Sequence, residues 1–323
     1  MKITPHAEGR VAGTGLYRMP AAIYHADPSP APSLSSSIAK ILIDQSPAHA
    51  HAAHPRLGKT GVADSDPTRA KEIGSAAHKL ILGQGAEIVA IDADDYRTKA
   101  AKEARASACE DGKLPILASD LRRAERLANY ADDRLASIPD CEGFHTAPAE
   151  LVGIVQDPSG AWLRIMMDRF EDRGSHAVIW DVKTGDQPAA PHLLGRRIEG
   201  MGMEVQAALY VRAVELLIPR LAGRVCFRWI FIENDLPHAV TVAEADSVTL
   251  GIGARKLALA LSRWNSACRT DQWPGYPARI VHPEYPGWAE QRWLEREAEP
   301  DLAPVDWDLA ASPNRPFTME TVA

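Results

Sequence analysis

The chain has 323 residues, of which 46% are hydrophobic and 24% are charged, and its formal net charge is −7. This composition is typical of a globular protein with one large or two small domains. It excludes a protein that coats nucleic acid through a general excess of positive charge. No apolar run is long enough to span a membrane, and no secretory signal is recognisable at the start. We therefore expect a cytoplasmic protein without membrane contact.

The first 140 residues are predicted to form an irregular arm followed by a mainly helical part. Residues 1–35 are rich in Pro, Ala, Gly and Ser and are expected to form an irregular N-terminal arm. Apolar residues at helical spacing follow in residues 36–140, and they are interrupted by one short β-like run at 86–92. These features predict a helical part that precedes the main sheet.

The chain changes character between residues 144 and 184, within a predicted catalytic core at 141–285. Three β-like runs, at 145–156, 161–172 and 176–185, are separated by the turn sequences DPSG and EDRGS. An antiparallel meander is the simplest arrangement for them. A strong helix and a further strand follow, which predicts an α/β fold. Residues 286–323 are rich in Pro, Trp and acidic residues and are expected to form a C-terminal tail.

The sequence VIWDVKTGD at 178–186 contains the main candidate for chemistry. Alternate residues of a strand share a face, so Asp181 and Lys183 project together. In a meander, Asp168 of the preceding strand can join them. Two carboxylates can hold Mg²⁺ or Mn²⁺, whose bound water becomes a nucleophile, and a lysine can stabilise the developing charge. The alternative is a salt bridge at a strand end, worth about 0–1 kcal/mol on a surface.

Three further positions favour an active site. Gln206 and Tyr210 are four residues apart on the helix that follows Lys183, so one helical face can cover the candidate metal site. His78 lies on an earlier helix and is a possible third metal ligand through its neutral imidazole. An ordinary amphipathic helix and a partly buried histidine are the structural alternatives.

Three arginines are candidate phosphate contacts. Arg164 lies on the same strand as Asp168, and its planar guanidinium suits either a phosphate or Glu150. Arg196 and Arg197 are expected in a loop before the Gln206 helix, where they can contact the DNA backbone or remain solvated.

The sequences GSAAH, MMDRFED, WDVKTG and QAALY occur in this order and together resemble the RecB-type branch of the PD-(D/E)xK nuclease superfamily. Residues 24–57 are more similar still to the RecE-like (exodeoxyribonuclease VIII) exonucleases. The resemblance covers about residues 17–285. It implies a restriction-endonuclease-like core, a central mixed sheet flanked by helices, in a nuclease domain spanning 36–285.

The resemblance also implies roles for particular residues. The implied metal ligands are His78, Asp168 and Asp181, the implied catalytic residues are Asp168, Asp181, Lys183, Gln206 and Tyr210, and Glu150 is a possible supporting residue. Some relatives carry an iron–sulfur cluster held by a late group of cysteines. This chain has only four scattered cysteines, so no iron–sulfur cluster is expected.

The implied function is a Mg²⁺-dependent exonuclease, with Mn²⁺ as a substitute, that digests linear double-stranded DNA from its ends. By analogy it would act 5′→3′ in phage-type homologous recombination. It would assemble as a ring-shaped homo-oligomer and work beside a single-strand annealing protein. The alternatives are a Cas4-like or structure-specific endonuclease of the same superfamily, or a DNA-binding recombination module without catalytic activity.

Overall fold

The computed structural model describes residues 2–58 and 69–298. The chain divides into two compact units, residues 1–276 and residues 277–323, which are described separately. The first unit contains all of the residues that the sequence singles out for chemistry.

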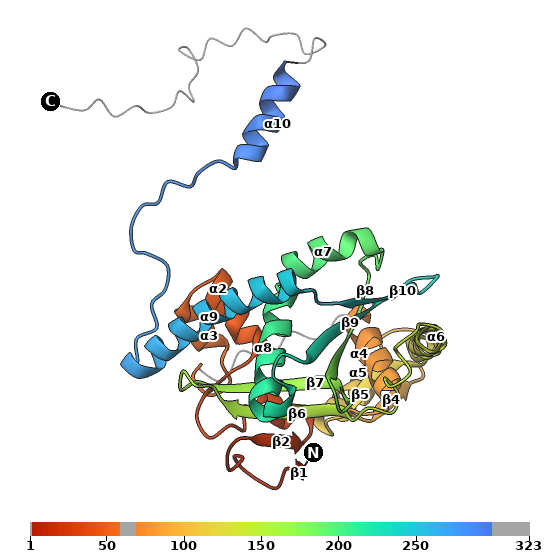
Figure 1. Cartoon of the computed structure of the whole chain (residues 1–323). Helices are drawn as coiled ribbons and strands as arrows, with labels where there is room; N and C mark the ends of the chain where they lie inside the picture. The colour runs from red at the N-terminus through yellow and green to blue at the C-terminus, as the bar shows by residue number, and fades with distance from the viewer. Residues whose placement is uncertain (1, 59–68, 299–323) are drawn as a thin grey trace, which may run out of the picture. The chain divides into compact units, whose positions relative to one another are not determined.

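An eight-stranded mixed sheet lies at the centre of the first unit (Figure 1). Its strand order is β1-β2-β6-β7-β8-β9-β10, and β3 pairs with β7 outside this path. The strands are β1 (Ile3–Pro5), β2 (Gly15–Arg18), β3 (Ser33–Leu34), β6 (Ala149–Gln156), β7 (Trp162–Asp172), β8 (Ala177–Gly185), β9 (Val225–Glu233) and β10 (Val240–Glu244). A separate two-stranded sheet pairs β4 (Ile88–Ile91) with β5 (Leu114–Leu117) in parallel.

The predicted meander is confirmed. Strand β7 pairs antiparallel with both β6 and β8. Strand β9 then runs parallel to β8, which requires a crossover connection. Helices α7 (Pro191–Gly200) and α8 (Met203–Leu217) supply that crossover. The predicted α/β class, a central mixed sheet flanked by helices, is therefore confirmed.

Helices cover both faces of this sheet. Helices α2 (Ser36–Asp44), α8 and α9 (Ser247–Thr270) share one core cluster with it, and α4 (Arg69–Leu82) and α6 (Ala118–Ala136) share another. The remaining helices of this unit are α1 (Ala21–His25), α3 (Pro47–Ala53), α5 (Lys99–Glu110) and the short 3₁₀ helix η1 (Pro219–Leu221). In the described ranges, no helix is both long enough and apolar enough to cross a membrane.

The alternation of β8 decides which helices its charged residues meet. Val178, Trp180 and Val182 belong to the core cluster of α4 and α6, whereas Ile179 belongs to the cluster of α8. Since side chains alternate along a strand, Asp181 lies on the α8 side.

The N-terminal residues differ from the prediction. Residues 1–35 were expected to be irregular, but they contain β1, β2, α1 and β3. Strand β2 pairs antiparallel with β6, and β3 pairs parallel with β7. These strands have two to four residues each. Such short strands show no periodicity of their own, because their pairing depends on a sheet edge that forms more than 100 residues later.

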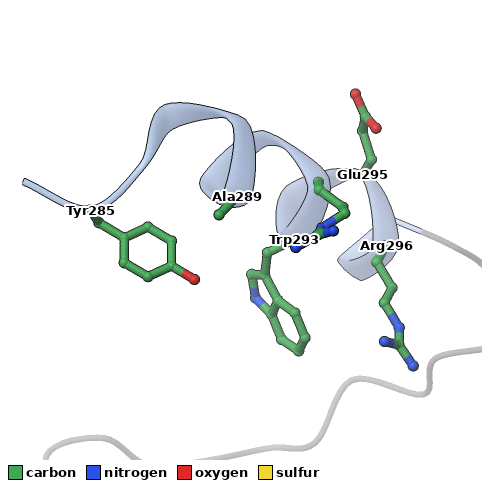
Figure 2. Close-up of a pocket in the computed structure, with 6 residues that line it drawn as sticks. Tyr285, Ala289, Trp293, Glu295 and Arg296 are labelled. Atoms are coloured by element: carbon green, nitrogen blue, oxygen red, sulfur yellow. The ribbon is translucent and has the colours of Figure 1, made fainter. Parts of the chain in front are cut away.

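The second unit contains the helix α10 (Gly287–Glu297) within its described residues, 277–298. Tyr285, Ala289 and Trp293 lie along one side of this segment and border a hollow of about 550 Å³ (Figure 2). Part of the predicted C-terminal tail is thus helical, and residues 299–323 lie outside the described residues.

Candidate active site

A pocket of about 240 Å³ in the first unit brings the predicted residues together. It is lined by side chains from the N-terminal segment, α4, β7, β8 and α8. The lining residues are Tyr24, His25, Ser35, Ser36, Ser37, His78, Arg164, Met166, Asp168, Asp181, Val182, Lys183, Gln206 and Tyr210. All six residues expected to bind metal or to take part in catalysis are among them.

The pocket lies where β7 and β8 part. Their antiparallel ladder ends at the pair Arg169–Trp180, and the same register would next bring Asp168 opposite Asp181. Instead of meeting a backbone acceptor on β7, the N–H of Val182 donates to Asp168 Oδ2 at 2.7 Å. The divergence of the two strands thus places two carboxylates side by side and opens space in front of them.

Asp181 is held by two neighbours of its own face. Nζ of Lys183 lies 2.6 Å from Oδ2 of Asp181, and Nε2 of Gln206 donates to Oδ1 at 2.8 Å. The side chain of Asp181 is only 5% exposed, so this is not the surface salt bridge weighed as an alternative. Burial raises the pKa of Asp181 most, Lys183 opposes this, and Asp168 raises it further.

Lys183 remains protonated in this setting. Burial alone lowers the pKa of Lys183, but the charges of Asp181 and Asp168 outweigh burial and raise it. The pocket therefore contains a fixed cation beside two carboxylates.

Asp168 is paired with His78. Nε2 of His78 lies 3.1 Å from Oδ2 of Asp168. Burial alone would raise the pKa of Asp168, but the charge and hydrogen bond of His78 lower it, with help from Lys183. Conversely, burial lowers the pKa of His78, and Asp168 overcomes this and raises it. The structure thus shows His78 as a partner of a carboxylate, and its role as a metal ligand stays a prediction.

Glu150 lies opposite Asp168 on β6. Strands β6 and β7 pair at Ala149 and at Leu151, on either side of Glu150, but not at Glu150 itself. The backbone of Glu150 has φ of +47°, in the left-handed region. A non-glycine residue in this region costs about 1–3 kcal/mol, and such strain is concentrated at functional sites. Burial raises the pKa of Glu150 most, His78 opposes this, and Asp168 raises it further. The charges of His78 and Asp168 therefore act on Glu150, which lies close to the acid pair formed by Asp168 and Asp181.

Tyr210 joins α8 to the sheet. Its hydroxyl donates to the carbonyl oxygen of Met166 at 3.0 Å. Burial raises the pKa of Tyr210 well above its usual value, so the phenol is neutral. Because Gln206 and Tyr210 lie one turn apart, α8 is fixed to β7 and β8 at two points.

Arg164 lies in the pocket wall, but its guanidinium contacts other residues of the chain. The residue is 4% exposed, and its Nη1 donates to the carbonyl oxygen of Ser33 at 2.6 Å and to Ser33 Oγ at 2.9 Å. It also lies 3.6 Å from Oδ1 of the buried Asp27. The structure therefore shows Arg164 anchoring the N-terminal segment to β7, where the sequence predicted a phosphate contact.

This anchor predicts an acid-sensitive contribution to stability. Burial alone would raise the pKa of Asp27, but hydrogen bonds from His54 and Ser33 and the charge of Arg164 lower it from 3.8 to about 2. The stabilisation is present above pH about 4 and is lost as the pH falls towards 2. Between these values the wild type should lose about 2 kcal/mol more unfolding free energy than Asp27→Asn. Urea unfolding at stepped pH measures this, and the exposed Asp94→Asn should follow the wild type. Equal losses in the wild type and Asp27→Asn would refute the prediction.

Arg196 and Arg197 lie in helix α7, so the predicted loop is wrong. Pro191 stands in its first turn, where its fixed φ and missing N–H suit a helix start. Arg196 is exposed. The guanidinium of Arg197 lies 4.8 Å from the ring centroid of Phe231, and its Nη1 donates to Gln187 O at 3.3 Å. The two arginines thus lie on a rigid element, and their contact with DNA stays a prediction.

Asp168 and Asp181 fit a divalent ion that keeps several water molecules in its coordination shell. Oδ2 of Asp181 is buried, and in the described part of the chain the ammonium of Lys183, 2.6 Å away, is its neighbour. Two carboxylates side by side in one pocket, with one ammonium beside them, are suited to a divalent ion. Across residues 2–58 and 69–298, no group of three or more His, Cys, Asp and Glu side chains is arranged to hold a metal. An ion held by Asp168 and Asp181 would therefore complete its coordination with water and substrate oxygens, as Mg²⁺ does.

The sequence did not indicate the N-terminal wall of the pocket. Tyr24 and His25 from α1, and the three serines at the start of α2, line the same pocket. Tyr24 is 6% exposed, and its hydroxyl lies 3.5 Å from the carbonyl oxygen of Arg164. In the sequence, only the run of three serines marks this segment. Such a run predicts where a helix begins, but it does not predict that the helix will line a pocket.

The fold and the pocket together define a class. A mixed sheet flanked by helices, with two carboxylates and a lysine at the point where two strands diverge, has the layout of a nuclease that uses a divalent ion. Residues 43–228, more than half of the chain, match the model of a family described as the PD-(D/E)XK nuclease superfamily. The chain belongs to this superfamily.

Solved structures support the fold assignment. A structure described as a "Putative exonuclease" from Eubacterium rectale is similar with a TM-score of 0.52 at 11% sequence identity. The similarity covers 84% of this chain and 94% of that one. A second structure, SSO0001, has a TM-score of 0.23 at 12% identity over 58% of this chain and 86% of that one, which is too dissimilar to support an argument. No curated protein matches the chain.

Proposed function

We propose that this protein is a Mg²⁺-dependent exonuclease that hydrolyses linear double-stranded DNA 5′→3′ in phage-type homologous recombination, as RecE-like enzymes do. One observation carries the nuclease activity. Asp168, Asp181 and Lys183 converge in a single pocket, where the side chain of Asp181 is only 5% exposed.

The residues have separate tasks in this proposal. Asp168 and Asp181 would hold the ion, which supplies an activated water and offsets charge on the phosphate when bound. Lys183 would orient the attacking water and stabilise negative charge in the transition state. Gln206 fixes the rotamer of Asp181, and Tyr210 fixes α8 against β7.

Two observations favour an exonuclease that acts on duplex ends. The similar solved structure from Eubacterium rectale is described as a "Putative exonuclease". The sequence at 24–57 resembles the RecE-like group, and part of this segment forms the N-terminal wall of the pocket. By the same resemblance we propose a homo-oligomeric ring around DNA and a single-strand annealing protein as partner.

End-labelled DNA tests this function. With Mg²⁺, label at the 5′ ends of a linear duplex should be released early and label at the 3′ ends late, while covalently closed circles remain intact. Lys183→Gln should be slower by about 10²–10³-fold, because a preorganised charge is lost. The oligomeric mass is measured by light scattering on the same sample.

Other outcomes would contradict the proposal in distinct ways. Cutting of closed circles would identify an endonuclease. Tight DNA binding without cleavage across several divalent metals would identify an inactive recombination module.

A further inference from the structure

Helix α2 forms one side of the active-site pocket, although it lies almost entirely before the family match, which begins at residue 43. It packs beside α8 and α9 in the first unit (Figure 1). Ser36 and Ser37 line the pocket. Lys40 follows Ser37 by three residues and Ser36 by four, so the three residues share one face of the helix. This face, defined by Ser36, Ser37 and Lys40, lies before the residues that match the family model.

Lys40 is a cation without a carboxylate partner. It is half-buried, and its Nζ donates to the carbonyl oxygen of Met201 at 3.3 Å. In the described residues, no carboxylate oxygen lies within 4.0 Å of this Nζ. By contrast, Nζ of Lys183 lies 2.6 Å from Asp181. The positive charge of Lys40 is therefore left for something outside the protein.

The electrostatics agree with this geometry. Burial lowers the pKa of Lys40 most, and the charge of Lys183 lowers it further, while Asp181 and Glu204 oppose this. Lys40 is therefore close enough to Asp181 and Lys183 to feel their charges. A second anion arriving beside Lys183 would relieve the repulsion between the two lysines.

The backbone leaves room for the Lys40 side chain. Gly202, which begins α8, has φ of +59°, a conformation that favours glycine. A Cβ at Gly202 would lie 2.9 Å from Cδ of Lys40. The aliphatic part of Lys40 thus passes over a position where a side chain would displace it, and its amine reaches the carbonyl oxygen of Met201 just before α8.

We propose that Lys40, with the Ser36 and Ser37 face of α2, binds the phosphate next to the scissile phosphate on the strand being cut. This inference rests on the proposed nuclease function. Asp168, Asp181 and Lys183 would act on the scissile phosphate. Lys40 lies one turn along α2 from the pocket-lining Ser36 and Ser37, within reach of the charges of Lys183 and Asp181, and offers a further cation. The Ser36 and Ser37 hydroxyls, and the first N–H groups of α2, which have no partner within the helix, add donors for the same anion.

DNA binding as a function of salt tests the proposal. Affinity for a fluorescent linear duplex is measured without added divalent metal, so that binding is observed in the absence of cleavage. Lys40→Gln should reduce the slope of log K against log salt by about 1 and weaken binding about tenfold at 0.1 M salt. Lys40→Arg should restore both values. With Mg²⁺, Lys40→Gln should raise KM more than it lowers kcat.

The controls separate this proposal from the function it rests on. Lys102→Gln removes the same charge from the exposed face of α5 and should leave slope, KM and kcat unchanged. If Lys40→Gln does not fold, Lys40→Met keeps the apolar stem that lies over Gly202 and serves instead. An unchanged salt slope, or an equal reduction in Lys102→Gln, would overturn the role of Lys40. Wild-type protein that binds duplex with the Lys40-dependent slope but never cleaves it would refute the nuclease function alone.

Discussion

Asp181→Asn is expected to lower the rate of duplex digestion by about 10³-fold or more. The substitution preserves shape and can still accept the hydrogen bond from Gln206, but it removes the charge that would hold a divalent ion. Such an ion contributes several kcal/mol of charge stabilisation, and about 4 kcal/mol corresponds to 10³-fold in rate. Initial rates on a linear duplex with saturating Mg²⁺ measure the effect.

Two controls make the Asp181 result specific. Asp94→Asn makes the same change of charge at an exposed position outside the pocket and should retain the wild-type rate. The Asp181→Asn protein should keep its circular dichroism spectrum and a cooperative thermal transition, since burial already disfavours the charged form of Asp181. A variant that is folded and as fast as the wild type would show that Asp181 has no part in the chemistry.

Removal of divalent metal is expected to abolish digestion entirely, and Mg²⁺ or Mn²⁺ should restore it. The pocket offers two carboxylates and, in the described residues, no group of three or more candidate protein ligands. An ion in such a site keeps much of its water and exchanges readily, so EDTA should remove it without unfolding the protein. The rate of duplex digestion is measured before EDTA, with EDTA, and after adding excess metal.

Thermal stability provides an independent measure of the same site. An ion that binds only the folded protein raises the Tm by mass action. Mg²⁺ should therefore raise the Tm of the wild type and leave that of Asp181→Asn nearly unchanged. Digestion at an undiminished rate in EDTA would contradict a metal-dependent mechanism.

The catalytic strands could be predicted because their signals are local. Alternation along β8 places Asp181 and Lys183 on one face, and helical spacing places Gln206 and Tyr210 on another. Short turn sequences between β6, β7 and β8 leave an antiparallel meander as the simplest pairing. These relations hold whatever the rest of the chain does.

Other features followed from packing between distant parts of the chain. Arg164 has the charge of a phosphate contact, but Ser33 and Asp27, more than 130 residues earlier, surround it. Lys40 shows nothing unusual in the sequence, and its position matters only because α2 packs against the start of α8. In the same way, α7 replaces the loop predicted for Arg196 and Arg197.

The sequence by itself determined the α/β class, the meander and the side-chain face that carries the acid and the lysine. The reason is that strand and helix periods are properties of neighbouring residues. Only the tertiary structure decided that β7 and β8 part at Asp168 and Asp181, that His78 pairs with Asp168, and that the N-terminal residues close the pocket. Each of these features depends on contacts between segments that are far apart in the chain. A local sequence pattern does not determine how such segments pack together.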